Sequence, residues 1–221
     1  MRAFLTGLAG LAVLGLVLFI GLHYIAAPSI VAQKSATLST ASVNEETSTY
    51  AIKIDYPQFG ISSVDAQIQK DIANAVDEFR SLPPDPPESA APQNSFDGSF
   101  GSVYLGPDIV SAQLILSQYT GGAHPMTILS GVSFDRMSGK RLLVDDALAL
   151  IGKTIAQVSA EASAQFEEKF GKDFFSEGAN TDPENFSSFT ISANQVTFIF
   201  QPYQVAAYAA GPQMVSFPRV E

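Results

Sequence analysis

The chain places a histidine, His124, in a loop between two runs of strand-like sequence. Gly121 and Gly122 precede it, and glycine adopts backbone angles that are closed to other residues. Pro125 follows it, and proline pushes the preceding residue toward extended geometry. We predict that these three residues structure the loop and hold His124 in a restricted pose. An imidazole titrates near neutral pH, so His124 suits either proton transfer or binding.

Catalysis by His124 needs partners that the sequence does not supply. A serine nucleophile often sits in a Gly-x-Ser-x-Gly elbow, and none occurs. The second histidine, His23, lies in an apolar segment and the chain has no cysteine, so no zinc site is expected. We therefore interpret His124 first as a loop-structuring hydrogen-bond residue, with ligand contact and general-base catalysis as the alternatives.

Two pairs of acidic neighbours, Asp145-Asp146 and Glu167-Glu168, are the other candidates for chemistry. Glycoside hydrolysis uses two carboxyl groups several ångströms apart, which is a distance that a sequence does not show. Their positions favour helix capping by Asp145 and a solvated helix face for the second pair. No Gly-rich phosphate loop or basic stripe occurs. We predict no catalytic residue, no metal ligand and no cofactor.

Three tyrosines, Tyr119, Tyr203 and Tyr208, are further binding candidates. Tyrosine combines a large apolar ring with a polar tip, which suits stacking on a sugar or anchoring a protein partner. Packing in the core, or a buried hydroxyl bond, is the alternative for each of them. Together with His124 they form the predicted binding set.

A predicted β-hairpin over Asp108–Lys140 carries His124. Side chains of a strand alternate between faces, and every second residue of Val110–Leu116 is apolar. The segment Ile128–Phe134 repeats much of this alternation, so the two runs are expected to pair antiparallel. The turn Asp135–Lys140 follows, with Gly139 available for a positive φ.

The other elements follow from apolar periodicity and from Gly and Pro punctuation. We predict strands at Thr49–Phe59, Ser95–Leu105 and Gln213–Phe217, a second hairpin over Phe189–Phe200, and amphipathic helices at Ile61–Phe79 and Ile151–Phe170. The predicted fold class is α+β: an antiparallel sheet with two amphipathic helices packed on one face, preceded by one N-terminal transmembrane helix.

The N-terminal segment Ala3–Ala27 is almost wholly apolar. About 20 such residues span a bilayer as a helix. Arg2 precedes the segment, and positive charge tends to stay in the cytoplasm, so we predict a single-pass protein with its C-terminal domain outside. Secretion after cleavage near Ala32 is the alternative, although the apolar run exceeds the usual signal-peptide core.

The segment Gln33–Ser48 is rich in Ser, Thr and Ala and lacks periodicity, which indicates a flexible tether. The predicted organisation is an anchor over residues 1–32, a tether over residues 33–48 and an extracytoplasmic α+β domain over residues 49–221.

Composition narrows the class of partner. The 221 residues are 46% hydrophobic and 15% charged, which suits one domain plus a membrane segment. A net charge of -10 disfavours nucleic acid and suits a basic partner or simple solubility. The absence of cysteine excludes disulfides and thiol chemistry.

Several motifs, taken in order, resemble a known family. They are Tyr56-Pro57-Gln58-Phe59, Gly121-Gly122-Ala123-His124-Pro125, Ser138-Gly139-Lys140 with Asp145, Asn185-Phe186-Ser187-Ser188-Phe189 and the run Phe200–Gly211. Over residues 49–217 the chain resembles the RsiV-like and PdaC-like extracytoplasmic domain. The resemblance implies an α+β module that occurs in a membrane-bound anti-sigma factor that senses lysozyme, and beside the catalytic domain of peptidoglycan deacetylases.

The resemblance implies binding rather than catalysis by this domain. Only Met1 and Arg2 precede the apolar segment and no deacetylase domain follows, so we expect neither parent activity. We expect a membrane-tethered, non-catalytic binding or sensor module of the bacterial envelope that contacts peptidoglycan glycan or a lysozyme-like protein. A cell-wall hydrolase that uses His124 and a purely structural envelope protein are the alternatives.

Overall fold

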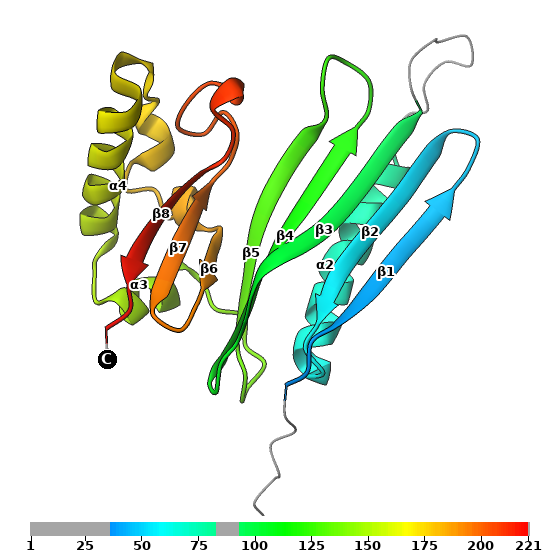
Figure 1. Ribbon diagram of the computed structural model, residues 1–221, viewed down its shortest axis with the longest axis horizontal. Helices are drawn as coiled ribbons and strands as arrows, with labels where there is room; N and C mark the ends of the chain where they lie inside the picture. Colours follow the sequence, from blue (N-terminus) through cyan, green and yellow to red (C-terminus); the bar gives the residue numbers. More distant parts are fainter. Residues whose placement is uncertain (1–35, 83–92, 221) are drawn as a thin grey trace, which may run out of the picture. The chain divides into compact units, whose positions relative to one another are not determined.

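A five-stranded sheet and a three-stranded sheet form the framework of the described part of the chain, residues 36–82 and 93–220 of the computed structural model (Figure 1). Three α-helices accompany them, so the predicted α+β class is confirmed for this part. No helix among the described residues is long and apolar enough to cross a membrane. The predicted membrane segment at residues 3–27 lies outside the described residues.

The five-stranded sheet has the order β1-β2-β3-β4-β5. Its strands are β1 (Ser39–Glu46), β2 (Tyr50–Gln58), β3 (Asn94–Leu105), β4 (Ile109–Tyr119) and β5 (Met126–Asp135). The predicted hairpin is confirmed as β4–β5, but β2 and β3 run parallel, so the sheet is mixed rather than purely antiparallel. Helix α2 (Ser62–Arg80) lies between β2 and β3 in the chain, and such a crossover is what a parallel pair requires.

Helix α2 covers one face of this sheet (Figure 1). Apolar side chains recur along it at spacings of three and four, and the strands alternate apolar and polar residues. The resulting core contains Val64, Ile68, Ile72, Val76 and Phe79 of α2 with Ile52, Ile54, Phe96, Leu114 and Val132 of the strands. The opposite face of β1, β2 and β3 carries polar side chains and is left to solvent over much of its area.

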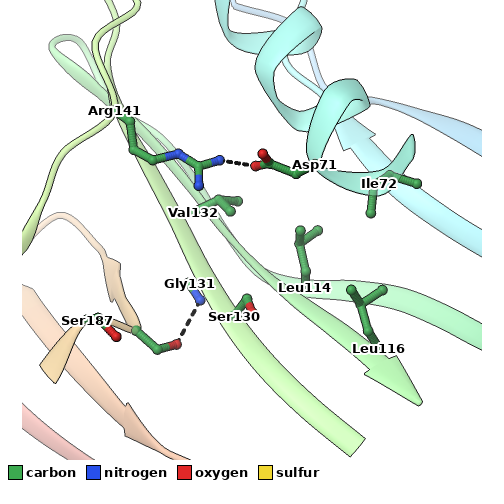
Figure 2. Close-up of a pocket in the computed structure, with 10 residues that line it drawn as sticks. Asp71, Ile72, Leu114, Leu116, Ser130, Gly131, Val132, Arg141 and Ser187 are labelled. Atoms are coloured by element: carbon green, nitrogen blue, oxygen red, sulfur yellow. Dashed lines mark hydrogen bonds and ion pairs between the residues drawn. The ribbon is translucent and has the colours of Figure 1, made fainter. Parts of the chain in front are cut away.

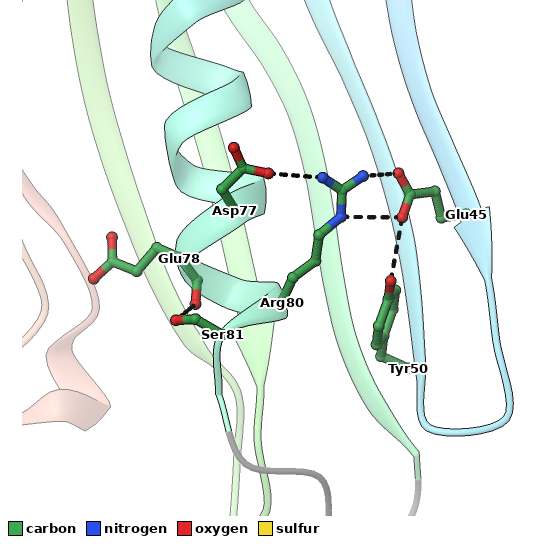
Figure 3. A network of polar contacts seen from close by, with 6 residues as sticks. All are labelled: Glu45, Tyr50, Asp77, Glu78, Arg80 and Ser81. Carbon is green, nitrogen blue, oxygen red and sulfur yellow. Dashed lines mark hydrogen bonds and ion pairs between the residues drawn. The ribbon is translucent and has the colours of Figure 1, made fainter.

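Strand β1 corrects the predicted tether over residues 33–48. It pairs antiparallel with β2 along its whole length, so the folded domain begins before the predicted boundary at Thr49. Figure 3 shows one cause: Arg80 at the end of α2 forms ion pairs with Glu45 of β1 and with Asp77. Tyr50 also donates a hydrogen bond to Glu45. A short polar edge strand stabilised by its neighbours has too little apolar periodicity to be recognised alone.

The second sheet is antiparallel and has the order β6-β7-β8. Its strands are β6 (Phe189–Ile191), β7 (Gln195–Phe200) and β8 (Gln213–Pro218), and its helices are α3 (Val144–Ile151) and α4 (Ile155–Phe170). Four short 3-10 turns complete the segment: Gly171–Asp173, Ser176–Ala179, Pro183–Phe186 and Tyr208–Ala210. A separate, phenylalanine-rich core joins α3, α4 and the second sheet.

The prediction that two helices cover one sheet face was wrong. Helix α2 packs on the five-stranded sheet, whereas α3 and α4 belong to the core of the second sheet. The predicted helix over residues 151–170 starts later, because Gly152 ends α3 with φ +64° and Thr154 caps α4. Gly152 and Thr154 are both visible in the sequence as capping signals. The apolar stripe continues across them, and the prediction therefore missed the break between the two helices.

The second sheet cannot extend the first one because the outer edge of β5 is already occupied. The side-chain amide of Gln201 accepts from the Leu129 N–H at 2.9 Å and donates to the Leu129 carbonyl at 2.7 Å. The Gly131 N–H donates to Ser188 Oγ at 3.0 Å. Side chains therefore satisfy the backbone groups that another strand would bind.

The N-terminus of α3 also departs from the sequence prediction. Leu143, not Asp145, is the N-cap residue, and the carboxylate of Asp146 accepts from the Leu143 N–H at 2.9 Å. This hydrogen bond, supported by Lys140, lowers the pKa of Asp146 below its ordinary value of 3.8. Asp145 is exposed to solvent.

We expect Asp146→Ala to lower the free energy of unfolding by about 1 kcal/mol at neutral pH, as the loss of a helix cap does. Because folding depresses this pKa, the stabilisation is fully present above the unfolded-state pKa and is lost as the pH falls through the folded-state pKa. Urea denaturation should therefore show a smaller difference between variant and wild type at strongly acidic pH. Asp145→Ala is the matched control, and an equal effect of both changes would contradict the assignment.

Candidate binding site

The loop between β4 and β5 presents His124 at the end of the hairpin. Gly121 and Gly122 have φ values of +93° and +94°, in the range that glycine adopts without strain. Nothing lies within 4 Å of the positions that their Cβ atoms would take, so backbone conformation rather than crowding selects glycine here. The loop projects from the sheet, and the His124 side chain is exposed.

His124 stacks on Tyr208, a residue more than 80 positions later in the chain. The two ring centroids are 3.9 Å apart and the ring planes differ by 17°. The Tyr208 hydroxyl donates to the Pro125 carbonyl at 3.0 Å, and His124 Nδ1 lies 3.0 Å from the same oxygen. A carbonyl oxygen only accepts, so Nδ1 carries the proton in this contact. One backbone carbonyl thus orients both rings.

Tyr203 adds a third ring, in an unusual backbone conformation. Its ring centroid lies 5.3 Å from that of Tyr208, the residue is 54% exposed and its φ is +70°. A left-handed conformation in a residue other than glycine costs about 1–2 kcal/mol and clusters at functional sites. We call His124, Tyr203 and Tyr208 the aromatic cluster.

Glutamine side chains hold the loop that carries the two tyrosines. Gln201 binds the edge of β5 at Leu129, as described above, and its backbone N–H donates to Gln204 Oε1 at 2.8 Å. The Gln204 amide in turn donates to the carbonyls of Gly178 and Asn185. These positioning residues were not among the predicted site residues, since only the tertiary structure shows which backbone groups their amides reach.

Of the remaining predicted residues, Tyr119 lies close to the aromatic cluster, whereas Gly139 lies apart from it. Tyr119 is half-buried at the base of the loop, where its hydroxyl donates to the Gly122 carbonyl at 3.2 Å. Gly139 has φ +71° in the turn after β5, where a Cβ would collide with Ser63 at the start of α2. Gly139 therefore serves the packing of α2 and takes no part in the aromatic cluster.

The aromatic cluster suits stacking and hydrogen bonding. Among the described residues, no carboxylate accepts a hydrogen bond from His124; the backbone carbonyl of Pro125 orients its ring instead. No group of three His, Asp or Glu side chains within the described ranges is placed to hold a metal ion. What the cluster does offer is exposed ring surface on a braced loop.

Apart from the aromatic cluster, the surface has a hollow of about 350 Å³ beside α2 (Figure 2). Its apolar lining includes Leu114 and Leu116, and its polar lining includes the ion pair between Arg141 and Asp71. The two charges neutralise each other and tie α2 to the segment after β5. None of the predicted site residues lines this hollow.

Two family profiles match the chain, one for each sheet. Residues 43–127 match the family described as deacetylase PdaC, and residues 140–219 match the family described as a protein of unknown function, DUF3298. The first match covers most of the five-stranded sheet with His124, and the second covers the three-stranded sheet with Tyr203 and Tyr208. The aromatic cluster therefore combines residues from both matched segments.

The chain is also similar to curated proteins of known name. Peptidoglycan-N-acetylmuramic acid deacetylase PdaC of Bacillus subtilis is 24% identical over 186 residues, which are 81% of this chain and 39% of that protein. Immunogenic protein MPT64 of Mycobacterium tuberculosis is 26% identical over 103 residues, 46% of this chain and 45% of the relative. The chain thus matches less than half the length of either relative.

Crystal structures of two DUF3298 family proteins share the fold. The protein from Pseudomonas aeruginosa superposes with a TM-score of 0.56 at 15% identity, covering 84% of this chain and 92% of that one. The protein from Bacteroides fragilis has a TM-score of 0.55 at 15% identity, covering 83% and 91%. At this level of identity the likeness establishes the fold and nothing further.

Proposed function

Since the chain carries a PdaC/DUF3298-like domain whose two segments share one exposed aromatic cluster, we propose that it is a non-catalytic binding module of the bacterial cell envelope that contacts peptidoglycan glycan. The Bacillus subtilis relative is named for its action on peptidoglycan, which supports the choice of ligand. The apolar segment at residues 3–27 would hold the module at the outer face of the cytoplasmic membrane.

The observation that carries the proposal is the aromatic cluster itself. A sugar ring has an apolar C–H face that stacks on aromatic rings and a rim of hydroxyls that bind polar tips. About half of the surface of Tyr203 is exposed, and the rings of His124 and Tyr208 are held together by their contacts with the Pro125 carbonyl. Rings held in place before binding lose little conformational entropy on binding, which favours affinity.

Retention on purified sacculi tests the proposal. We expect the full-length protein to cosediment with insoluble peptidoglycan, and Tyr203→Ala combined with Tyr208→Ala to weaken retention at least about tenfold. Aromatic stacking contributes about 0.5–1.5 kcal/mol per contact, and a loss of about 1.4 kcal/mol lowers affinity tenfold. Phe175→Ala is the matched control, because Phe175 is 45% exposed and lies outside the aromatic cluster. Thermal denaturation verifies that both variants are folded.

Three results would argue against glycan binding by the aromatic cluster. They are no retention of the wild-type protein, equal retention of the double tyrosine variant, and equal weakening by Phe175→Ala. Release of soluble fragments from the sacculi, abolished by His124→Ala, would instead support the hydrolase alternative.

A lysozyme-like protein is the second candidate partner, favoured by the net charge of -10. Complementary charge raises the rate of encounter with a basic protein and is weakened by salt. Calorimetric titration with lysozyme at two salt concentrations separates the candidates. Suppose that lysozyme binds with saturable heat that falls with salt, and that sacculi do not retain the protein. The ligand would then be a lysozyme-like protein and not peptidoglycan glycan.

A further inference from the structure

A row of polar side chains crosses the five-stranded sheet from edge to edge. The register of the strands sets Asn44 opposite Lys53, Lys53 opposite Asp97, Asp97 opposite Ser117, and Ser117 opposite Thr127. Each of the five strands therefore contributes one residue at the same level. We call these five residues the polar row.

The polar row lies on the face opposite α2. The neighbours of its residues along the strands, among them Ile54, Phe96 and Leu116, pack in the core with α2, and successive side chains of a strand point to opposite faces. Lys53 and Asp97 are exposed, and Ser117 and Thr127 are half-buried. No described residue forms an ion pair with Lys53 or Asp97, so both groups can bind a ligand.

The surface is hollowed at the centre of this row, on β2, β3 and β4. A depression of about 280 Å³ is lined by Lys53, Asp97 and Ser117 together with Asp55 and Ser99. Small serine side chains lie between longer charged ones, which leaves room at the surface of the sheet. The lining offers an ammonium donor, carboxylate acceptors and hydroxyls that both donate and accept.

We propose that the polar row is a subsite for an extended, uncharged glycan chain that lies across the strands. This inference rests on the proposed function and names a second contact surface for the same ligand. Neighbouring strands are about 4.8 Å apart, which is close to the length of one sugar unit in an extended β-linked chain. Successive sugars can therefore meet successive strands, and their hydroxyls and amides find alternating donors and acceptors.

The polar row and the aromatic cluster adjoin. Thr127, at the β5 end of the row, is two residues from Pro125, whose carbonyl accepts from Tyr208. The Ser117 and Thr127 hydroxyls are 2.9 Å apart and continue the polar surface to this point. The row spans roughly 20 Å at the usual strand spacing, so a short oligosaccharide engages one surface and a longer one engages both.

The dependence of affinity on ligand length tests the polar row. The probes are β-1,4-linked N-acetylglucosamine oligomers, a disaccharide and a hexasaccharide, titrated calorimetrically into the full-length protein. We expect the hexasaccharide to bind at least about tenfold more tightly than the disaccharide, since hydrogen bonds to charged groups are among the stronger ones. Lys53→Ala combined with Asp97→Ala should remove this gain and leave the affinity for the disaccharide unchanged.

A matched control removes one positive and one negative charge from α2, on the other side of the sheet. Lys70→Ala combined with Glu78→Ala alters exposed residues of α2 and should keep the full gain with length. Two results would overturn the proposal that the polar row is a glycan subsite. One is equal affinity of both oligomers for the wild-type protein, and the other is an undiminished gain in affinity with length in the variant that lacks Lys53 and Asp97. Either result leaves retention on sacculi through the aromatic cluster standing, whereas loss of that retention removes the proposed function itself.

Discussion

Gly131→Ala is expected to lower the free energy of unfolding by about 3 kcal/mol or more, because this glycine is where the second sheet meets β5. A Cβ at Gly131 would overlap the carbonyl group of Phe189 at the start of β6. Rigid backbone rather than a flexible side chain stands in the way, so the sheets must separate or the strand must shift. Urea denaturation followed by circular dichroism measures the loss.

Gly101→Ala is the matched control on the same sheet. Nothing lies within 4 Å of the position that its Cβ would take, and its φ is not positive. We expect a change within about 1 kcal/mol, the usual difference between Gly and Ala where no neighbouring atom is in the way. Similar losses for the two substitutions would show that the loss at Gly131 does not come from its close approach to Phe189.

Phe186→Ala is expected to cost about 3–5 kcal/mol, as the truncation of a fully buried phenylalanine does. Phe186 is 0% exposed, and its ring meets those of Phe198 and Phe200 edge-on, at 5.5 Å between centroids in both cases. Removing the ring leaves a cavity between the turn before β6 and strand β7. The shift of the urea midpoint at unchanged slope measures the cost.

Phe175→Ala, on the exposed surface, provides the comparison for this prediction. It should change the free energy of unfolding by less than about 1 kcal/mol, since surface substitutions rarely exceed this. If Phe186→Ala were equally mild, the core of the second sheet would not depend on this ring.

The motif Asn185–Phe189 shows why a recognisable motif need not be a binding site. Asn185 donates to the carbonyl of Glu177, Phe186 fills the core, Ser188 binds the edge of β5 and Phe189 begins β6. Each of these four residues joins two parts of the fold. The resemblance based on these residues therefore predicts architecture. The evidence for ligand binding comes from the aromatic cluster instead.

Local patterns in the sequence were sufficient to predict most of the elements. Alternation of apolar residues located β2, β3 and the β4–β5 hairpin, and a spacing of three and four located α2, because both signals depend only on neighbours in the chain. The same patterns did not reveal β1, in which only Ala41 and Val43 are apolar. They also merged the beginning of α4 with α3, because one apolar stripe crosses Gly152.

For the candidate site, too, the sequence predicted some features and the tertiary structure decided others. The sequence by itself singled out His124, Tyr119, Tyr203 and Tyr208, because residue chemistry and loop glycines are visible without a fold. Only the tertiary structure decided that His124 stacks on Tyr208 and that the polar row lines up across five strands. Strand register and contacts between distant segments depend on which surfaces pack together, and a linear pattern does not contain that information.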